Sequence, residues 1–216
     1  LSITPGADLS GADLSDTSLI STDLTKARMA GIALTGSDLT EASLVGADLR
    51  YSICHKAIFD KADLHHANLW NIDLRGASAK GTIFCKCWLG NSNLIEADLR
   101  GADFSGAWLT AADLSNSLLS ASTLAGVSLA RACMREVDLT GAFAVGADFR
   151  SAILNGAIIR AANLSGANLR EASLIDADLS LADLVGADLR GAQLDGAVLN
   201  GSRHDSKTRW PEGFRP

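Results

Sequence analysis

The chain has 216 residues, of which 47% are hydrophobic, and a formal net charge of −6 at pH 7. This negative balance argues against direct binding to nucleic acid or to an anionic lipid surface, because both attract basic proteins. No stretch approaches 18 consecutive apolar residues, so the sequence predicts no membrane-spanning helix.

An apolar residue stands at every fifth position from Leu9 to Leu199, without an insertion. Of these 39 positions 29 are Leu, and the residue two places earlier is Ala in 26 cases. A fixed internal period is typical of repeat architectures, in which one unit stacks on the next. Every fifth residue advances about 140° around an α-helix, so these leucines would form no apolar stripe. We therefore predict no helix within residues 7–201.

The spacing inside each unit is that of a short strand. If the apolar residue is position i, then i−2 and i point to one side and i−1 points to the other. Positions i+1 and i+2 must turn the chain, and 17 of the 20 glycines occupy i+2, where a tight corner favours a residue without Cβ. Proline is absent from residues 7–201, as expected of stacked strands. We predict that i−2 and i form the core.

Units such as Ala7-Asp8-Leu9-Ser10-Gly11 and Ala187-Asp188-Leu189-Arg190-Gly191 resemble the A(D/N)LXX motif of the pentapeptide-repeat family. The resemblance covers about nine tenths of the chain. It implies an all-β fold, a right-handed quadrilateral β-helix with four pentapeptides per coil and about ten coils. Residues 20 apart would then stack directly, about 4.8 Å from each other. We expect a lead-in over residues 1–6, the β-helix over 7–201 and a C-terminal capping tail over 202–216.

The four cysteines do not form a disulfide framework in this arrangement. Cys54 and Cys87 are expected to point inward and Cys85 and Cys133 outward, with no pair placed for bridging. Unpaired thiols favour a reducing compartment, so the cytoplasm is the expected location. Leu1 is not a start methionine, so a removed signal peptide, and with it a lumenal or periplasmic location, stays an open alternative.

Candidate catalytic groups are few. His65, His66 and Cys85 are expected on the wet surface and do not supply the three or four converging ligands of a Zn²⁺ site. The Asp and Asn residues at i−1 belong to the family motif, and we expect them to accept hydrogen bonds from the turning backbone. No Ser–His–Asp order, phosphate-binding loop or dinucleotide fingerprint is found, and an interior of Leu and Ala leaves no pocket. We expect no enzyme activity, no metal and no cofactor.

One side of the predicted rod concentrates the aromatic residues. We number the faces one to four by Leu9, Leu14, Leu19 and Leu24. Trp, Tyr and Arg dominate the hot spots of protein interfaces, so we expect a partner-docking strip on face one. The other interpretation is that these aromatic residues simply tolerate solvent. The strip comprises Tyr51, Trp70, Trp88, Trp108, Arg150, Arg170 and Arg190.

The repeat register ends after Gly201. The segment Thr208–Phe214 resembles a tail that closes pentapeptide-repeat proteins of cyanobacteria. An open β-helix end exposes unpaired backbone groups and apolar side chains. We expect Trp210 and Phe214 to cap the last coil around Leu194 and Leu199, with partner binding as the alternative role.

Three hypotheses for function follow. The first is a non-catalytic protein-interaction scaffold with an unidentified protein partner and no direct contact to nucleic acid; its oligomeric state stays open, with a monomer favoured. The second is a DNA mimic that inhibits or protects DNA gyrase, like family members of the quinolone-resistance type. Eight acidic and three basic residues give face two a net charge of −5, which is the required sign, but this is sparse beside duplex DNA with about one charge per 1.7 Å. The third is a structural protein of the thylakoid lumen or the periplasm.

Overall fold

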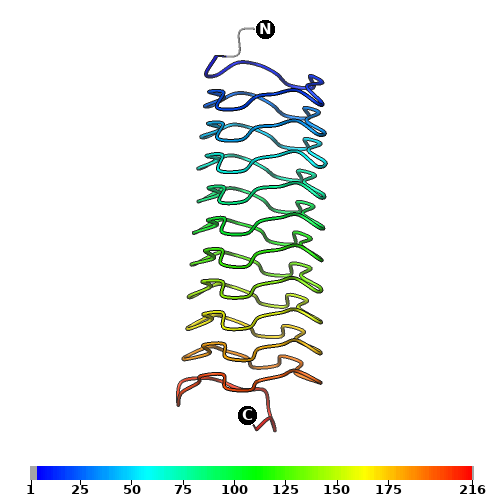
Figure 1. The fold of residues 1–216 in the computed structure, drawn as a ribbon. Helices are drawn as coiled ribbons and strands as arrows, with labels where there is room; N and C mark the ends of the chain where they lie inside the picture. Colours follow the sequence, from blue (N-terminus) through cyan, green and yellow to red (C-terminus); the bar gives the residue numbers. More distant parts are fainter. Residues whose placement is uncertain (1–3, 216) are drawn as a thin grey trace.

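The computed structural model describes residues 4–215 and stacks them into a straight rod of coils, with the two ends of the chain at opposite ends of the rod (Figure 1). Leu1–Ile3 and Pro216 lie outside the described residues, so the expected lead-in over residues 1–6 falls partly beyond them.

The coils are held together by a ladder of isolated parallel β-bridges. Between residues 4 and 215 there is no α-helix and no continuous strand. The bridges join residues 20 apart, from Asp8↔Arg28 to Asp183↔Arg203. Four five-residue units complete one turn, so the rod has four sides. The four-sided β-helix predicted from the sequence is confirmed.

A backbone hydrogen bond closes the tight turn at the corners, except after Leu14, where the hydroxyl of Thr17 donates to the Leu14 carbonyl instead. In the first unit the N–H of Ala12 donates to the carbonyl of Leu9 at 3.0 Å. The residue at i+2 has a positive φ at all 39 corners, with glycine at 17 and other residues at 22 of them. The φ angle is nearly the same for the smallest residue and for a large one, at 67° for Gly11 and 61° for Leu181. The stack therefore imposes the left-handed corner, and glycine removes the steric strain that a Cβ suffers there.

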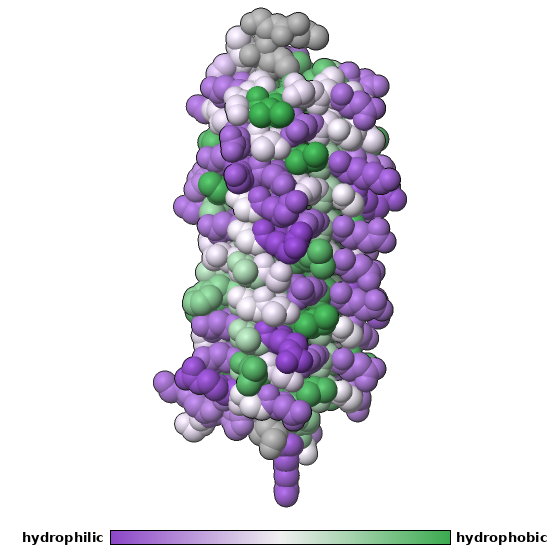
Figure 2. Space-filling model, viewed as in Figure 1, coloured by the Kyte–Doolittle hydropathy of each residue, from purple (hydrophilic) through white to green (hydrophobic). Residues whose placement is uncertain are grey.

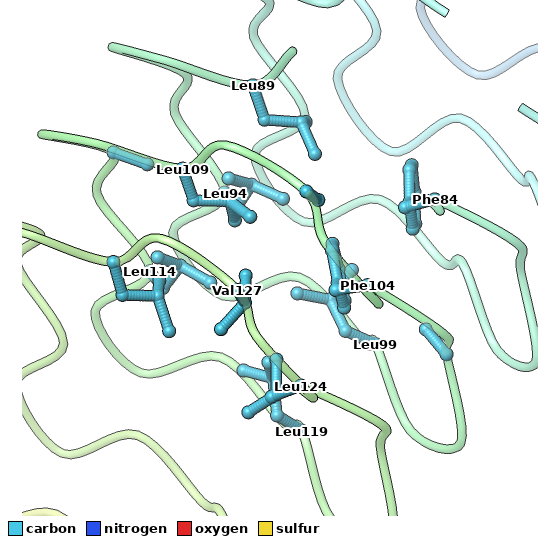
Figure 3. Packing of buried hydrophobic residues seen from close by; sticks show 14 of the residues in the cluster. Phe84, Leu89, Leu94, Leu99, Phe104, Leu109, Leu114, Leu119, Leu124 and Val127 are labelled. Carbon is cyan, nitrogen blue, oxygen red and sulfur yellow. The ribbon is translucent and has the colours of Figure 1, made fainter. Parts of the chain in front are cut away.

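The interior is filled by the residues at i and i−2. Leucines such as Leu39, Leu94 and Leu169 are fully buried, and the alanines at i−2 lie between them. Figure 3 shows Leu94 and other buried side chains pointing inward from successive coils, with Phe84 and Phe104 one above the other. Their rings stack with centroids 4.7 Å apart and planes 9° apart. Such direct stacking helps to fill the core, in which apolar side chains predominate, as the close packing of protein interiors requires.

Some small polar residues at inward positions are satisfied by the neighbouring coil, whereas the buried hydroxyls of Ser92 and Ser122 have no hydrogen-bond partner in the described part of the chain. The hydroxyl of Ser52 donates to the carbonyl of Met29 at 3.0 Å, and that of Thr82 donates to Phe59 at 2.6 Å. A buried hydroxyl without a partner would be destabilising. At Ser52 and Thr82 the carbonyl one coil earlier therefore allows a hydroxyl residue to replace the usual Ala.

The outward Asp and Asn residues at i−1 bind the turning backbone. Asp63 accepts the N–H of His65 at 2.9 Å, and Asp103 accepts that of Ser105 at 2.9 Å. These are local side-chain caps of the kind that Asp and Asn favour in turns. The role expected for these residues is confirmed at these units.

The bridge ladder continues past the point where the sequence register ends. Arg203 pairs with Asp183, and Arg209 pairs with Asp188 across 21 residues. One extra residue is accommodated between these two bridges. The carboxylate of Asp205 accepts the N–H of Gly186 at 3.0 Å, and the hydroxyl of Thr208 donates to the carbonyl of Leu184 at 2.9 Å. The tail therefore begins as a further part of the coil and leaves it only after Arg209.

Candidate functional site

Two outward tryptophans on face one are direct neighbours. Trp88 and Trp108 both occupy i−1, and their backbones form a parallel bridge. Their rings meet edge to face, with centroids 5.6 Å apart and planes 70° apart. Both stay exposed, at 55% and 48%. On the side of the rod shown in Figure 2, strongly hydrophobic side chains appear mostly as separate spots among polar ones.

Trp70 completes the aromatic cluster from the preceding coil. It occupies i+1, and the residue at i+1 in the next coil is Gly90. A Cβ on Gly90 would lie 2.7 Å from Cε3 of Trp70 and still closer to Cζ3. Gly90 is buried, and Trp70 is the least exposed of the three indoles at 40%. The missing side chain of Gly90 therefore lets the indole of Trp70 lie against the backbone.

The three indoles form the walls of a shallow apolar concavity, which we call the tryptophan notch. Its volume is about 340 Å³, and Gly90 and Thr110 complete its lining together with Trp70, Trp88 and Trp108. Aromatic and apolar walls with one hydroxyl suit an apolar side chain from a partner. The notch is open to solvent, so it does not enclose a small substrate as an active site does.

A second concavity continues from the notch along the same face, and we call it the basic groove. Thr110 lines both concavities. The groove has a volume of about 580 Å³. Its lining combines short side chains with three arginines and one carboxylate. These residues are Thr110, Ser128, Ala130, Arg131, Arg150, Ser151, Asn168, Arg170 and Glu171.

The arginines of the basic groove differ in their pairing. Arg150 binds Asp148 through two hydrogen bonds, Nε to Oδ1 at 2.9 Å and Nη2 to Oδ2 at 2.7 Å. This guanidinium holds the pKa of the Asp148 carboxyl below its usual range. Two residues before Arg170 stands the neutral Asn168, at the position that Asp148 occupies relative to Arg150. Among residues 4–215, no carboxylate lies within 4.0 Å of the guanidinium of Arg170 or of Arg131.

The structure brings together five of the seven residues expected in the docking strip. Trp70, Trp88 and Trp108 line the notch, and Arg150 and Arg170 line the groove. The remaining two lie apart from both concavities. Tyr51 is 59% exposed at a corner, and Arg190 is held by Asp188 at 2.6 Å.

The lining residues that the sequence did not predict include Gly90, Thr110, Arg131 and Glu171. Gly90 carried a signal, because it is the one repeat glycine at i+1 and follows a tryptophan by one coil. The other three carried none, since each occupies an ordinary position for its residue type.

The tail places its aromatic residues at the end of the rod. Trp210 follows the bridged Arg209, as a residue at position i does in the repeat. Its ring stacks on Phe214 with centroids 5.4 Å apart and meets His204 edge to face at 5.5 Å. Trp210 and Phe214 are partly buried against the core. Phe214 shares a surface concavity with Leu194, within the region that the cap is expected to cover.

Other reactive chemistry is sparse. In the described part of the chain, no group of three or more His, Cys, Asp or Glu is arranged to hold a metal ion. Desolvation raises the pKa of the Cys85 thiol to about 11 and that of Cys87 to about 12, so both are protonated at neutral pH and are weak nucleophiles. None of the residues from 4 to 215 belongs to a helix long and apolar enough to cross a membrane.

Comparison with known protein families finds one match. The family model described as Pentapeptide repeats matches the chain in 8 copies. A comparison with curated proteins finds no match. The matched copies cover residues 5–40, 27–65, 42–78, 57–94, 81–116, 108–141, 132–169 and 162–201.

Three of the solved structures to which the chain is similar show the range of its likeness. HetL, a pentapeptide repeat protein involved in heterocyst differentiation regulation from the cyanobacterium Nostoc sp. strain PCC 7120, is 31% identical over 92% of this chain and 87% of its own, with a TM-score of 0.36. Rfr23 from the cyanobacterium Cyanothece 51142 is 30% identical over 52% of this chain and 63% of its own, with a TM-score of 0.39. QnrB1, a plasmid-mediated fluoroquinolone resistance protein, is 20% identical over 90% of this chain and 94% of its own, with a TM-score of 0.38.

Proposed function

Since the chain belongs to the pentapeptide-repeat family of right-handed quadrilateral β-helices, we propose that it is a non-catalytic protein-interaction scaffold of about ten coils. The observation that carries this proposal is the tryptophan notch. Trp70, Trp88 and Trp108 come from three successive coils and leave large indole surfaces in water. Clustered exposed apolar surface of this kind marks interaction sites in soluble proteins.

The position of the notch supports recognition of a partner. Outward side chains add little to the core, so selection for stability alone does not explain two adjacent tryptophans at i−1. A tryptophan anchor buried in an interface typically contributes about 2 kcal/mol or more to binding. Edge-to-face contact between Trp88 and Trp108 holds the walls of the notch in place.

The test separates binding from stability. We expect Trp88→Ser combined with Trp108→Ser to lose the partners that wild type captures from the source cell. Its stability should fall by only about 1 kcal/mol, the size of a lost cross-strand contact. Pull-downs and thermal melts of both proteins measure the two effects.

Phe143→Ser is the matched control for this experiment. Phe143 is also an outward aromatic residue at i−1, and its exposure of 55% equals that of Trp88, but it lies on face four. The control should keep the partners of wild type. If the double variant also retains them, the notch is not the docking site.

The acidic face supports one alternative, a DNA mimic that acts on DNA gyrase. Face two carries a net charge of −5, which is the sign needed to occupy a DNA site. One of its carboxylates is neutralised, because Asp73 lies 2.8 Å from the guanidinium of Arg75. We therefore rank this function below the scaffold.

A further inference from the structure

We propose that the tryptophan notch and the basic groove together bind one extended protein segment, which carries a large apolar side chain and, about four to six residues away, an acidic side chain. The inference rests on the proposed scaffold function and names the chemistry of the partner. The segment lies along the axis of the rod on face one, with the apolar side chain between the indoles and the acid among the arginines.

The two concavities form one channel. Its floor consists of small residues at i+1 in three consecutive coils, Gly90, Thr110 and Ala130, and Thr110 belongs to both parts. Trp88 and Trp108 border the channel at i−1. A ligand seated in the notch can therefore extend into the groove past Thr110.

The spacing of the two parts defines the length of the segment. Trp108 and Asn168 are three coils apart, which is about 14 Å at the usual separation of neighbouring strands. An extended chain rises about 3.3 Å per residue, so roughly four residues span this distance. From Trp88 the distance is four coils, or about 19 Å, which corresponds to roughly six residues.

Charge identifies the second side chain as a carboxylate. Arg150 is neutralised by Asp148, whereas Arg131 and Arg170 have no carboxylate within 4.0 Å in the described part of the chain. These two guanidiniums are available for the strong charge-assisted hydrogen bonds that Arg forms with acids. They stand on a protein whose net charge is −6, so they are a local feature rather than part of a basic surface.

The same charges disfavour a nucleic acid. Glu171 also lines the groove and accepts a hydrogen bond from Ser151 at 3.3 Å. With Asp148 nearby, a chain of phosphates would meet two carboxylates as well as the arginines. A single acidic side chain can reach the arginines without contacting these carboxylates. A polyanion carries a charge at every phosphate and is repelled by them.

Recognition must occur through side chains. The backbone of face one is already used within the ladder, since Leu89 N–H donates to Trp108 at 2.7 Å and Trp108 N–H donates to Cys87 at 2.9 Å. A partner therefore cannot add as a further strand, which is the usual mode at an open sheet edge. Affinity depends on the anchor in the notch and on the ion pair in the groove.

A peptide selection tests this inference. Random peptides of about twelve residues, long enough to span the channel, are displayed and selected on the full chain. Peptides that also bind the Trp88→Ser, Trp108→Ser variant are removed. We expect the enriched sequences to combine Trp, Phe or Leu with Asp or Glu four to six positions away, and a synthetic member to bind about tenfold more weakly to Arg170→Gln.

Arg100→Gln is the matched control. Arg100 also occupies i+1, but it lies on face three and is paired with Asp98 at 2.6 Å. It should leave the affinity of the synthetic peptide unchanged. Enriched peptides without an acid, or equal binding to Arg170→Gln and wild type, would overturn the inferred chemistry and leave the notch as a docking site.

Two further outcomes also count against the inference. Failure to enrich any peptide over the counter-selection would overturn it, while the pull-down with the tryptophan variants separately decides whether the scaffold function holds. An oligothymidylate that displaces the selected peptide and binds more tightly would assign the channel to single-stranded nucleic acid instead.

Discussion

The residue at i+2 carries the conformational strain of each unit. Its φ is positive whether the residue is Gly196 at 70° or Ala161 at 53°. A left-handed conformation costs an L-residue about 1–2 kcal/mol. The ladder enforces it, because the N–H at this corner donates to the next coil, as that of Ala161 does to the carbonyl of Ser180 at 2.9 Å. Glycine is thus favoured at the corner but is not required.

Replacing a corner alanine by glycine should therefore stabilise the protein. We expect Ala161→Gly to raise the free energy of unfolding by about 0.5–1 kcal/mol, because relief of the strained φ exceeds the backbone entropy that glycine loses on folding. The neighbouring Ala162 is buried at i−2 and has no positive φ. Ala162→Gly should lower the free energy by about 1 kcal/mol or more. Thermal melts of both variants measure these effects. A lower melting temperature for Ala161→Gly would contradict the predicted relief of strain.

The coil is the structural unit of this β-helix, and each coil is stabilised by packing against the coils on either side of it. At the carboxyl end the tail supplies half a coil of bridges and then turns its aromatic residues over the core. Leu184 N–H donates to Arg203 at 2.7 Å, and Leu189 N–H donates to Arg209 at 2.6 Å. The stacked rings of Trp210 and Phe214 lie beyond these bonds. We propose that they protect the last bridges from water.

Point substitutions separate the aromatic lid from the bridges, which a deletion of residues 203–216 would remove together. We expect Trp210→Ser with Phe214→Ser to lower the thermal midpoint and to speed amide exchange at Leu184 and Leu189, because the end coil frays once its apolar cover is lost. Exchange at Leu94, in the middle of the rod, should stay unchanged and serves as the internal control. Equal protection of Leu184 and Leu189 in both proteins would show that the tail has another role.

For the whole molecule, the five-residue period is sufficient to predict the coil, the inward residues and the contact between Trp88 and Trp108. These features depend only on a 20-residue repeat that never slips. The period alone does not predict the tryptophan notch. The shape of the notch depends on how the indole of Trp70 fits over Gly90, and the repeat does not encode that fit. The charge of the groove likewise depends on the substitution of Asn168 for the usual acid. The tail ladder was missed because Asp205 and Thr208 accommodate an insertion that breaks the register.

The acidic face sets the last prediction, which concerns DNA gyrase. We expect no inhibition of DNA supercoiling at micromolar protein, because the net charge of −5 on face two is spread along the whole rod. Hydrogen bonds within the turns further reduce the number of free carboxylate oxygens that this face could offer to a DNA-binding site. Asp113, for example, accepts two hydrogen bonds from Ser115, at 3.0 and 2.6 Å. Supercoiling assays with wild type and with Asp73, Glu96 and Asp113 each replaced by Lys decide the point. Inhibition by wild type that disappears in the folded triple variant, as checked by its melt, would make the DNA mimic the better function, because only the charge of this face separates the two proteins.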